Sequence, residues 1–352
     1  MREASTGAER ELPSSGSSGS SGARTRGAAD GSGQDALPAA QQELLRRAIR
    51  LERWTLAAVA LGVLLVGALA GQSQSMKAAW MEDSLSLLPP LAFLIAARRI
   101  RRRPTPEHPY GHHRSIGMAH MVASVALLGM GAFLVIDSAT TLLSRERAPV
   151  GITVIAGHAM WTGWLMILVM ALTTIGPVIL GRKKAKLAEP LHDKVLYADA
   201  DMNKADWQSA LATIVGVLGI GIGWWWADAV CALLISASII HDGVKNLRGA
   251  VRGLADARAR TYDDSASHPL TREVVSVAER EAWVREAAAR VRDEGHVFHV
   301  ELFVVPAEGT PAELARLCED LRERIRDIDW KLHDIVVAPV TEIPAAQVGG
   351  TA

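Results

Sequence analysis

Carboxylates occur inside two apolar stretches of the chain, where an ionisable side chain is costly and usually lines an ion path or pairs with another charge. In the later stretch, residues with possible ligand atoms recur every three or four positions and so share one face of a helix: Asp199, Met202, Asn203 and Asp206. The earlier stretch holds the other candidates: Glu82, Asp83 and Ser86. Glu82 and Ser86 are four residues apart and share one helix face. Two facing helices of this kind can offer a divalent cation one carboxylate each, together with neutral donors.

The donor atoms indicate which metals suit such a site. Carboxylate, hydroxyl and amide oxygens are hard ligands that favour Mg²⁺, Mn²⁺ or Fe²⁺, whereas histidine would suit Zn²⁺ better. Neither candidate segment contains a histidine. Asp199 and Asp201 lie at the start of their stretch, so both can equally be solvated at the cytoplasmic membrane interface. Asp206 lies deeper, where solvation is a poorer explanation, and the sequence therefore favours Asp206 as a ligand.

The elements that must position these residues are membrane helices. The chain has 352 residues, of which 49% are hydrophobic, with 38 basic and 38 acidic side chains. A helix needs about 20 apolar residues to cross the hydrocarbon core. Stretches of suitable length and composition cover residues 54–71, 78–97, 116–143, 152–180, 198–222 and 224–240. Pro89-Pro90 falls inside the second of these six predicted spans and predicts a kink there.

This composition excludes several classes of protein. Six apolar spans argue against a wholly soluble enzyme. Two cysteines are too few for a disulfide scaffold, and a net charge of zero argues against a general nucleic-acid binder.

The basic residues predict the orientation of the spans. Lys and Arg gather before the first span and in alternate connections after it, in residues 46–53, 98–103, 182–186 and 245–252. The other connections hold few of them. Because Lys and Arg concentrate in cytoplasmic loops, we expect both termini in the cytoplasm. The expected location is the inner or plasma membrane of the cell, with the chain crossing it several times.

The end of the chain has the pattern of a small α+β domain. Helical spacing and strand alternation predict, in order, a helix over residues 273–293, a strand over 296–305, a helix over 310–326 and a strand over 334–340. We expect Asp293 and His296 to be surface residues of this domain. It contains no catalytic triad, phosphate-binding loop, CxxC pair or dinucleotide-binding glycine pattern, so no enzymatic function is expected.

The predicted organisation has four parts. A Ser- and Gly-rich tail over residues 1–40 is expected to be disordered, because it cannot bury enough apolar surface to order itself. A six-helix transmembrane domain over 41–253 follows it. A linker over 254–270 then leads to the cytoplasmic α+β domain over 271–345.

Two short sequences resemble a known family. The loop after the second span contains Glu107-His108-Pro109-Tyr110-Gly111-His112-His113-Arg114, and the sixth span begins Gly223-Trp224-Trp225-Trp226-Ala227-Asp228. Both are similar to sequences of the cation diffusion facilitators, whose members carry an HPYGHGR-like sequence in the loop between the second and third spans. The resemblance covers about residues 54 to 342. It implies a six-helix membrane protein with a ferredoxin-like cytoplasmic domain, acting as a homodimer that exports divalent metals in exchange for protons.

The resemblance also implies which residues form the transport site. The family pattern is Asp-x-x-x-Asp or His-x-x-x-Asp in the second span and His-x-x-x-Asp in the fifth. Counted back from His108, the positions in the second span fall on Glu82 and Ser86. Those in the fifth fall on Met202 and Asp206, so one carboxylate per span is kept.

Other assignments of the site residues stay open. A shift by one residue would bring in Asp83 in place of Glu82, and a rotation of the fifth span would bring in Asn203 or Asp199. In the family the loop after the second span can bind a second metal. The candidates for that site are His108 and His112, which are four residues apart.

The function that the resemblance implies is proton-coupled efflux of a divalent cation by alternating access. The cargo would be Mn, Fe, Co, Ni or Zn, and no tightly bound cofactor is expected. A proton and a cation compete for the same carboxylate lone pairs, so protonation would release the metal on the far side. The expected partners are the metal ion, protons, the lipid bilayer and a second copy, with no nucleic acid. The alternative is a metal-binding sensor or scaffold in the membrane that does not transport, because two of the usual ligands are missing.

Overall fold

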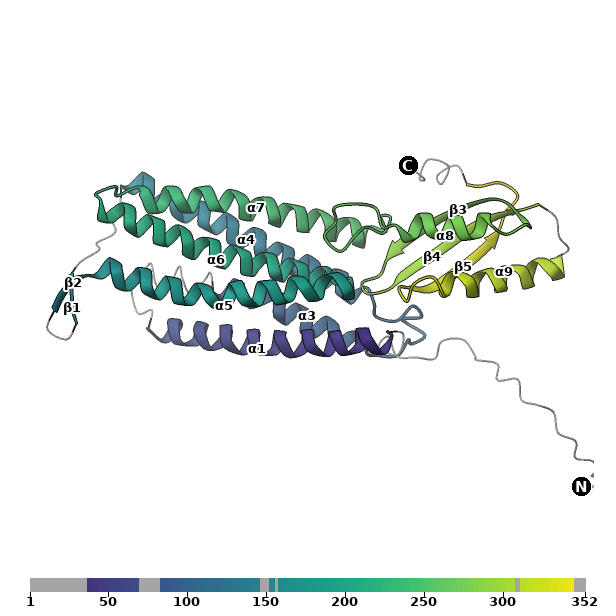
Figure 1. Ribbon diagram of the computed structural model, residues 1–352, viewed down its shortest axis with the longest axis horizontal. Helices are drawn as coiled ribbons and strands as arrows, with labels where there is room; N and C mark the ends of the chain where they lie inside the picture. Colours follow the sequence, from purple (N-terminus) through teal and green to yellow (C-terminus); the bar gives the residue numbers. More distant parts are fainter. Residues whose placement is uncertain (1–36, 70–82, 146–151, 156–157, 308–310, 345–352) are drawn as a thin grey trace, which may run out of the picture. The chain divides into compact units, whose positions relative to one another are not determined.

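The structure is a computed structural model and describes residues 37–69, 83–145, 152–155, 158–307 and 311–344. Within these residues, a series of helices precedes a small α+β region (Figure 1). The helices of the first region are α1 (Ala39–Leu69), α3 (Leu88–Arg99), α4 (Ser115–Ser144), α5 (Thr162–Leu191), α6 (Lys194–Gly221) and α7 (Ala227–Leu254). In the described part of the chain, three helices are long and apolar enough to cross a membrane: α4, α5 and α7.

Helix α6 occupies the centre of this helical region, because it contacts α3, α4, α5 and α7. Helices α4 and α7 also pack closely against each other. A Cβ atom at Gly243 would lie 2.9 Å from the Leu128 Cα atom, so only glycine allows the observed approach. Small residues commonly let the backbones of membrane helices come this close. This packing leaves α6 with buried positions along its first half, where the candidate ligands lie.

The second predicted span is divided rather than kinked. Residues 83–85 are helical, a turn follows, and α3 begins only at Leu88. Pro89 and Pro90 lie in the first turn of α3. At that place the missing N–H of proline removes no helical hydrogen bond, so the prolines begin a helix instead of bending one.

The fourth predicted span begins too early. Its first residues form a hairpin of β1 (Ile152–Ile155) and β2 (His158–Trp161), which pair antiparallel, and α5 starts only at Thr162. The prediction of helix over the start of this segment is therefore wrong. β1 has the sequence Ile-Thr-Val-Ile, and such β-branched residues favour a strand over a helix.

The C-terminal region is a three-stranded sheet with two helices, as far as the described residues extend. Its elements are α8 (Leu270–Glu279), β3 (Val284–Asp293), β4 (Phe298–Pro306), α9 (Pro311–Arg326) and β5 (Leu332–Pro339). The strand order is β3-β4-β5, with β3 antiparallel and β5 parallel to β4. Helix α8 packs against β3 and β4, and α9 packs against β5. The predicted second helix and both predicted strands are confirmed.

The long helix predicted over residues 273–293 is wrong in its second half. Helix α8 ends at Glu279, and β3 follows after a short turn. Ala287, Ala289 and Val291 belong to the apolar core of this region, which is the two-residue period of a strand. Alanine and charged residues in this segment favour a helix locally, but pairing with β4 determines the outcome.

Candidate functional site

Ser86 and Asp206, which the sequence assigns to facing positions, are in direct contact. Ser86 lies in the turn before α3, and Asp206 lies about 18 Å along α6 from its start. The Ser86 hydroxyl donates a hydrogen bond of 3.3 Å to Oδ1 of Asp206. Both residues are half-buried. The structure thus brings together one candidate ligand from each of the two segments.

The neighbouring candidates differ in their surroundings. Met202, one turn before Asp206, is 1% exposed and packs in an apolar cluster with Leu127, Met130 and Ile239. Asp83 is half-buried, three residues before Ser86. Glu82 lies outside the described residues.

Asp199 and Asn203 belong to a separate buried network. The Lys184 ammonium lies 2.7 Å from a carboxylate oxygen of Asp199 and 3.2 Å from one of Glu52, and all three side chains are at most 2% exposed. The Asn203 amide donates to the Asp199 carboxylate at 3.3 Å and to its main-chain oxygen at 2.8 Å. The charge of Asp199 is already matched by a lysine. Because Lys184 of α5 contacts both Asp199 of α6 and Glu52 of α1, this network holds the three helices together.

The sequence contains a signal for this ion network, although Lys184 and Glu52 both stand among other charged residues. Lys184 lies four residues before Ala188 and seven before Leu191, and all three are buried on one face of α5. Glu52 continues a buried face of α1 in the same way, after Leu45, Ala48 and Ile49. Their helical spacing from buried apolar residues would have distinguished these two buried charges from the solvated charged residues beside them in the sequence.

Two further polar residues of α6 are bound by α7. Asn246 donates a hydrogen bond of 2.8 Å to the Asp201 carboxylate, and Lys204 lies 2.6 Å from the Asp242 carboxylate. Asp201 is therefore held in a contact between helices and is not simply solvated.

The loop histidines His108 and His112 lie beside each other, with ring centroids 4.6 Å apart. Desolvation and the neighbouring His108 and two arginines lower the pKa of His112. Across the described ranges of the chain, no three side chains of His, Cys, Asp or Glu gather closely enough to enclose a metal ion. The structure thus places the two rings together without a third protein ligand from those ranges.

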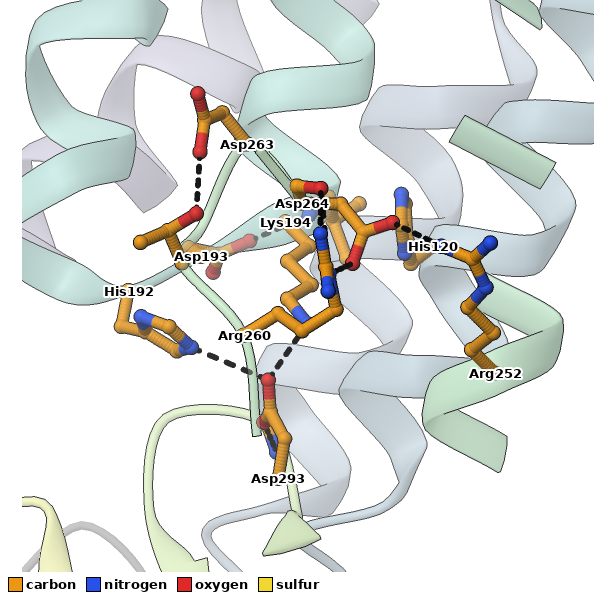
Figure 2. A network of polar contacts seen from close by, with 12 residues as sticks. His120, His192, Asp193, Lys194, Arg252, Arg260, Asp263, Asp264 and Asp293 are labelled. Carbon is orange, nitrogen blue, oxygen red and sulfur yellow. Dashed lines mark hydrogen bonds and ion pairs between the residues drawn. The ribbon is translucent and has the colours of Figure 1, made fainter. Parts of the chain in front are cut away.

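A second polar network joins the corner between α5 and α6 to the turn between β3 and β4 (Figure 2). His192, Asp193 and Lys194 occupy the corner. Asp293 lies 3.1 Å from the His192 ring and 2.8 Å from the Lys194 ammonium. His296 lies 2.7 Å from Asp193. These contacts attach the C-terminal region to the start of the helix that carries Asp206.

The expectation that Asp293 and His296 are surface residues is wrong. His296 is 2% exposed, and the Asp293 side chain is 7% exposed. Burial opposes ionisation of Asp293, but Lys194 and His192 outweigh it and hold the pKa of this carboxyl well below its usual range. The sequence could not show these contacts, because their partners lie about one hundred residues apart along the chain.

Comparison with known proteins gives this arrangement its context. Residues 54–255 match the model of the cation efflux transmembrane domain, which is more than half of the chain. The chain belongs to the cation diffusion facilitator family. Like this family, it is a multi-pass membrane protein that moves metal cations out of a compartment, with the metal ion as its substrate. It is therefore a transporter and not an enzyme.

Two relatives of this cation diffusion facilitator cover most of its length. It is 23% identical to the manganese efflux system protein MneS of Bacillus subtilis over 258 residues. The aligned residues make up 72% of this chain and 82% of the relative. It is 25% identical over 263 residues to the magnetosome protein MamM of Paramagnetospirillum magneticum, which is 73% of this chain and 76% of the relative.

Proposed function

We propose that this cation diffusion facilitator exports Mn²⁺ in exchange for protons. The observation that carries the proposal is the contact between Ser86 and Asp206, which joins a carboxylate and a hydroxyl from two segments inside the helical region. Oxygen donors suit Mn²⁺, and neither residues 82–86 nor residues 199–206 include a histidine that would favour Zn²⁺. The likeness to a manganese efflux protein supports the same metal.

The proposed ligands are Asp206, Ser86 and one carboxylate of the preceding residues, Glu82 or Asp83. Met202 and Asn203 border the site one turn away on α6. A thioether is a soft ligand, so Met202 contributes more to the apolar wall of the site than to Mn²⁺ binding. Asp199 is left out of the proposed set because Lys184 holds its carboxylate.

Competition between metal and proton drives the proposed cycle. In the inward-open state the ionised carboxylates bind Mn²⁺ from the cytoplasm. In the outward-open state a proton takes the same oxygen lone pairs and the metal leaves. Alternating access follows if the segment with Ser86 and helix α6 separate on one side at a time. An inward proton gradient then drives metal export.

The proposed architecture has six membrane spans, with both termini in the cytoplasm. The concentration of Lys and Arg in alternate connections supports this orientation. We assign the membrane domain to residues 41–253, the linker to 254–270 and the cytoplasmic domain, with a ferredoxin-like fold, to 271–345. The tail over 1–40 precedes them. The proposal places a homodimer of this chain in the plasma membrane.

The test is metal uptake into inside-out proteoliposomes with an imposed proton gradient. Mn²⁺, Fe²⁺, Co²⁺, Ni²⁺ and Zn²⁺ are compared for the wild-type protein, for Asp206→Asn, and for Gln208→Ala as a control on the same helix. We expect gradient-dependent Mn²⁺ uptake that is lost in Asp206→Asn and kept in Gln208→Ala. A proton-sensitive dye inside the vesicles records the opposite proton flux.

Each other result contradicts a definite part of the proposal. Uptake that persists in Asp206→Asn removes the site assignment. Uptake of Mn²⁺ without proton movement removes the antiport. Binding of Mn²⁺ without uptake of any metal would identify a sensor or scaffold instead of a transporter.

A further inference from the structure

An apolar groove runs between α3 and α4 on the outside of the helical region. Its cavity volume is about 210 Å³. Small side chains form the floor: Ala92, Ala96, Ser115 and Ala119. Large, exposed apolar side chains form the rims: Leu88, Leu91, Ile95, Met118 and Val122. The groove exists because the side chains of the floor are smaller than those of the rims.

The groove lies on a membrane helix and is open on its outer side. Helix α4 is long and apolar enough to cross a bilayer, and α3 packs against it, so we infer that both rims face lipid hydrocarbon. The rim side chains of the groove are between 37% and 48% exposed, and in the described part of the chain no element covers them. The floor runs along α3 from Leu88 to Arg99, a rise of about 16 Å, which accommodates a large part of one extended acyl chain.

A basic cluster stands at one end of the groove. Arg99, in the last turn of α3, lines the groove itself. The exposed residues Arg98, Arg101, Arg102 and Arg103 surround it in the sequence. Among the residues that the structure describes, none of these five arginines forms an ion pair with a carboxylate. Their positive charge is therefore available to an anion at the membrane surface.

We propose that this groove binds an anionic phospholipid, with one acyl chain along α3 and the phosphate on Arg99. The apolar floor accepts the chain, and the exposed arginines attract the negative head group from the cytoplasmic leaflet. Basic pockets between membrane helices on this side recognise anionic head groups in this way. The bound lipid braces α3 against α4, and α3 directly follows the turn with Ser86.

A second copy of the chain fits this surface less well. Homodimers are usually related by a twofold axis, so the same patch meets itself. Docking through this groove would set five arginines of one copy beside the same five of the other. The charge complements an anionic lipid and opposes an identical protein surface.

The experiment is native mass spectrometry of the full-length protein in detergent. Phosphatidylglycerol and phosphatidylcholine with the same acyl chains are added separately. Arg99→Gln removes the head-group contact, and Ala92→Leu fills the floor. Arg53→Gln, which removes an exposed arginine of α1 that does not line the groove, is the matched control. We expect the wild-type protein and Arg53→Gln to retain phosphatidylglycerol in preference to phosphatidylcholine.

The variants separate the two parts of the proposal. Arg99→Gln should weaken retention of phosphatidylglycerol about fivefold, the effect of one cation near a membrane surface. Ala92→Leu should weaken retention of both lipids. Equal retention by Arg99→Gln and Arg53→Gln, or no preference for phosphatidylglycerol, overturns the proposal. So does cross-linking between copies through Leu91→Cys in a background with Cys231 and Cys318 replaced by serine. Transport activity enters none of these measurements.

Discussion

The ring of His296, in the turn between β3 and β4, lies 2.7 Å from the carboxylate of Asp193, the N-cap residue of α6. The other carboxylate oxygen of Asp193 accepts hydrogen bonds from the main-chain N–H groups of Val195 and Leu196. One aspartate therefore caps the helix that carries Asp206 and also attaches the C-terminal region to it. A displacement of the β3–β4 turn must pull on the first turn of α6.

Removing the Asp193 side chain should destabilise the protein by more than replacing its carboxylate with an amide. Asp193→Ala loses the acceptor for two main-chain N–H groups, at a cost of about 1 to 2 kcal/mol, and leaves His296 buried without it. Asp193→Asn keeps an acceptor oxygen and should lose less. Thermal unfolding in detergent, followed by circular dichroism, measures both. Equal losses for the two variants would show that the cap is not the important contact.

Acid should destabilise the folded protein between pH 6.5 and 4. Burial is the largest cause that lowers the pKa of His113 to about 4, and His333 adds to it. Burial and then His192 lower the pKa of His268 to about 4 as well. The unfolded chain takes up these protons near pH 6.5, whereas the folded chain does not until pH 4. This contribution to stability is thus complete above pH 6.5 and is lost as the pH falls towards 4.

The unfolding midpoint measured across this pH range tests the effect. For His113 the loss amounts to at most about 3 kcal/mol. His113→Gln should flatten the dependence on pH, while the exposed loop variant His108→Gln should not. An unchanged slope in His113→Gln would remove His113 as its cause.

Lys184 should be essential to the fold although it lies in a run of basic residues. Lys184→Met leaves Glu52 and Asp199 buried without a cation, which costs about 3 to 5 kcal/mol. Adding Glu52→Gln and Asp199→Asn should restore much of the loss. Lys183→Met, at the exposed neighbouring position, is the control and should change stability little. Size-exclusion profiles and thermal unfolding in detergent report the outcome, and equal stability of the two lysine variants would contradict the network.

Gly295→Ala should disturb the attachment of the C-terminal region to α4. Gly295 has a φ angle of 117°, and an added Cβ would lie 2.8 Å from the Ile116 Cβ and 2.9 Å from the His113 carbonyl oxygen. We expect a loss of about 1 to 3 kcal/mol from backbone strain, with a further loss from the clash. Gly129→Ala, at an open position on α4, should be neutral or slightly stabilising. Chemical unfolding of both variants in detergent compares them, and a neutral Gly295→Ala would exclude the close approach.

Patterns within a single element made much of the fold predictable. Helical spacing placed Met202 and Asn203 on the buried face of α6, and strand alternation located β4. The family pattern assigned Ser86 of the second span and Asp206 of the fifth span to one site, and the two residues are in contact.

Features that depend on distant partners could not be predicted in this way. β3 is a strand only because β4 pairs with it, although its own alanines favour a helix. The ion pair of Asp199 requires Lys184 from another helix, so the sequence alone left Asp199 as a candidate ligand or a solvated residue. Whether Glu82 or Asp83 completes the site depends on the orientation of a segment that begins at the edge of the described residues.

The two prolines at the start of α3 reduce the hydrogen bonding between that helix and the preceding segment. Neither Pro89 nor Pro90 has an N–H group, so neither donates a main-chain hydrogen bond back to the segment with Ser86. A swivel of that segment about Leu87 therefore leaves the hydrogen bonds within α3 intact. If the proposed transport cycle separates Ser86 from Asp206, α3 itself can therefore stay packed against α4.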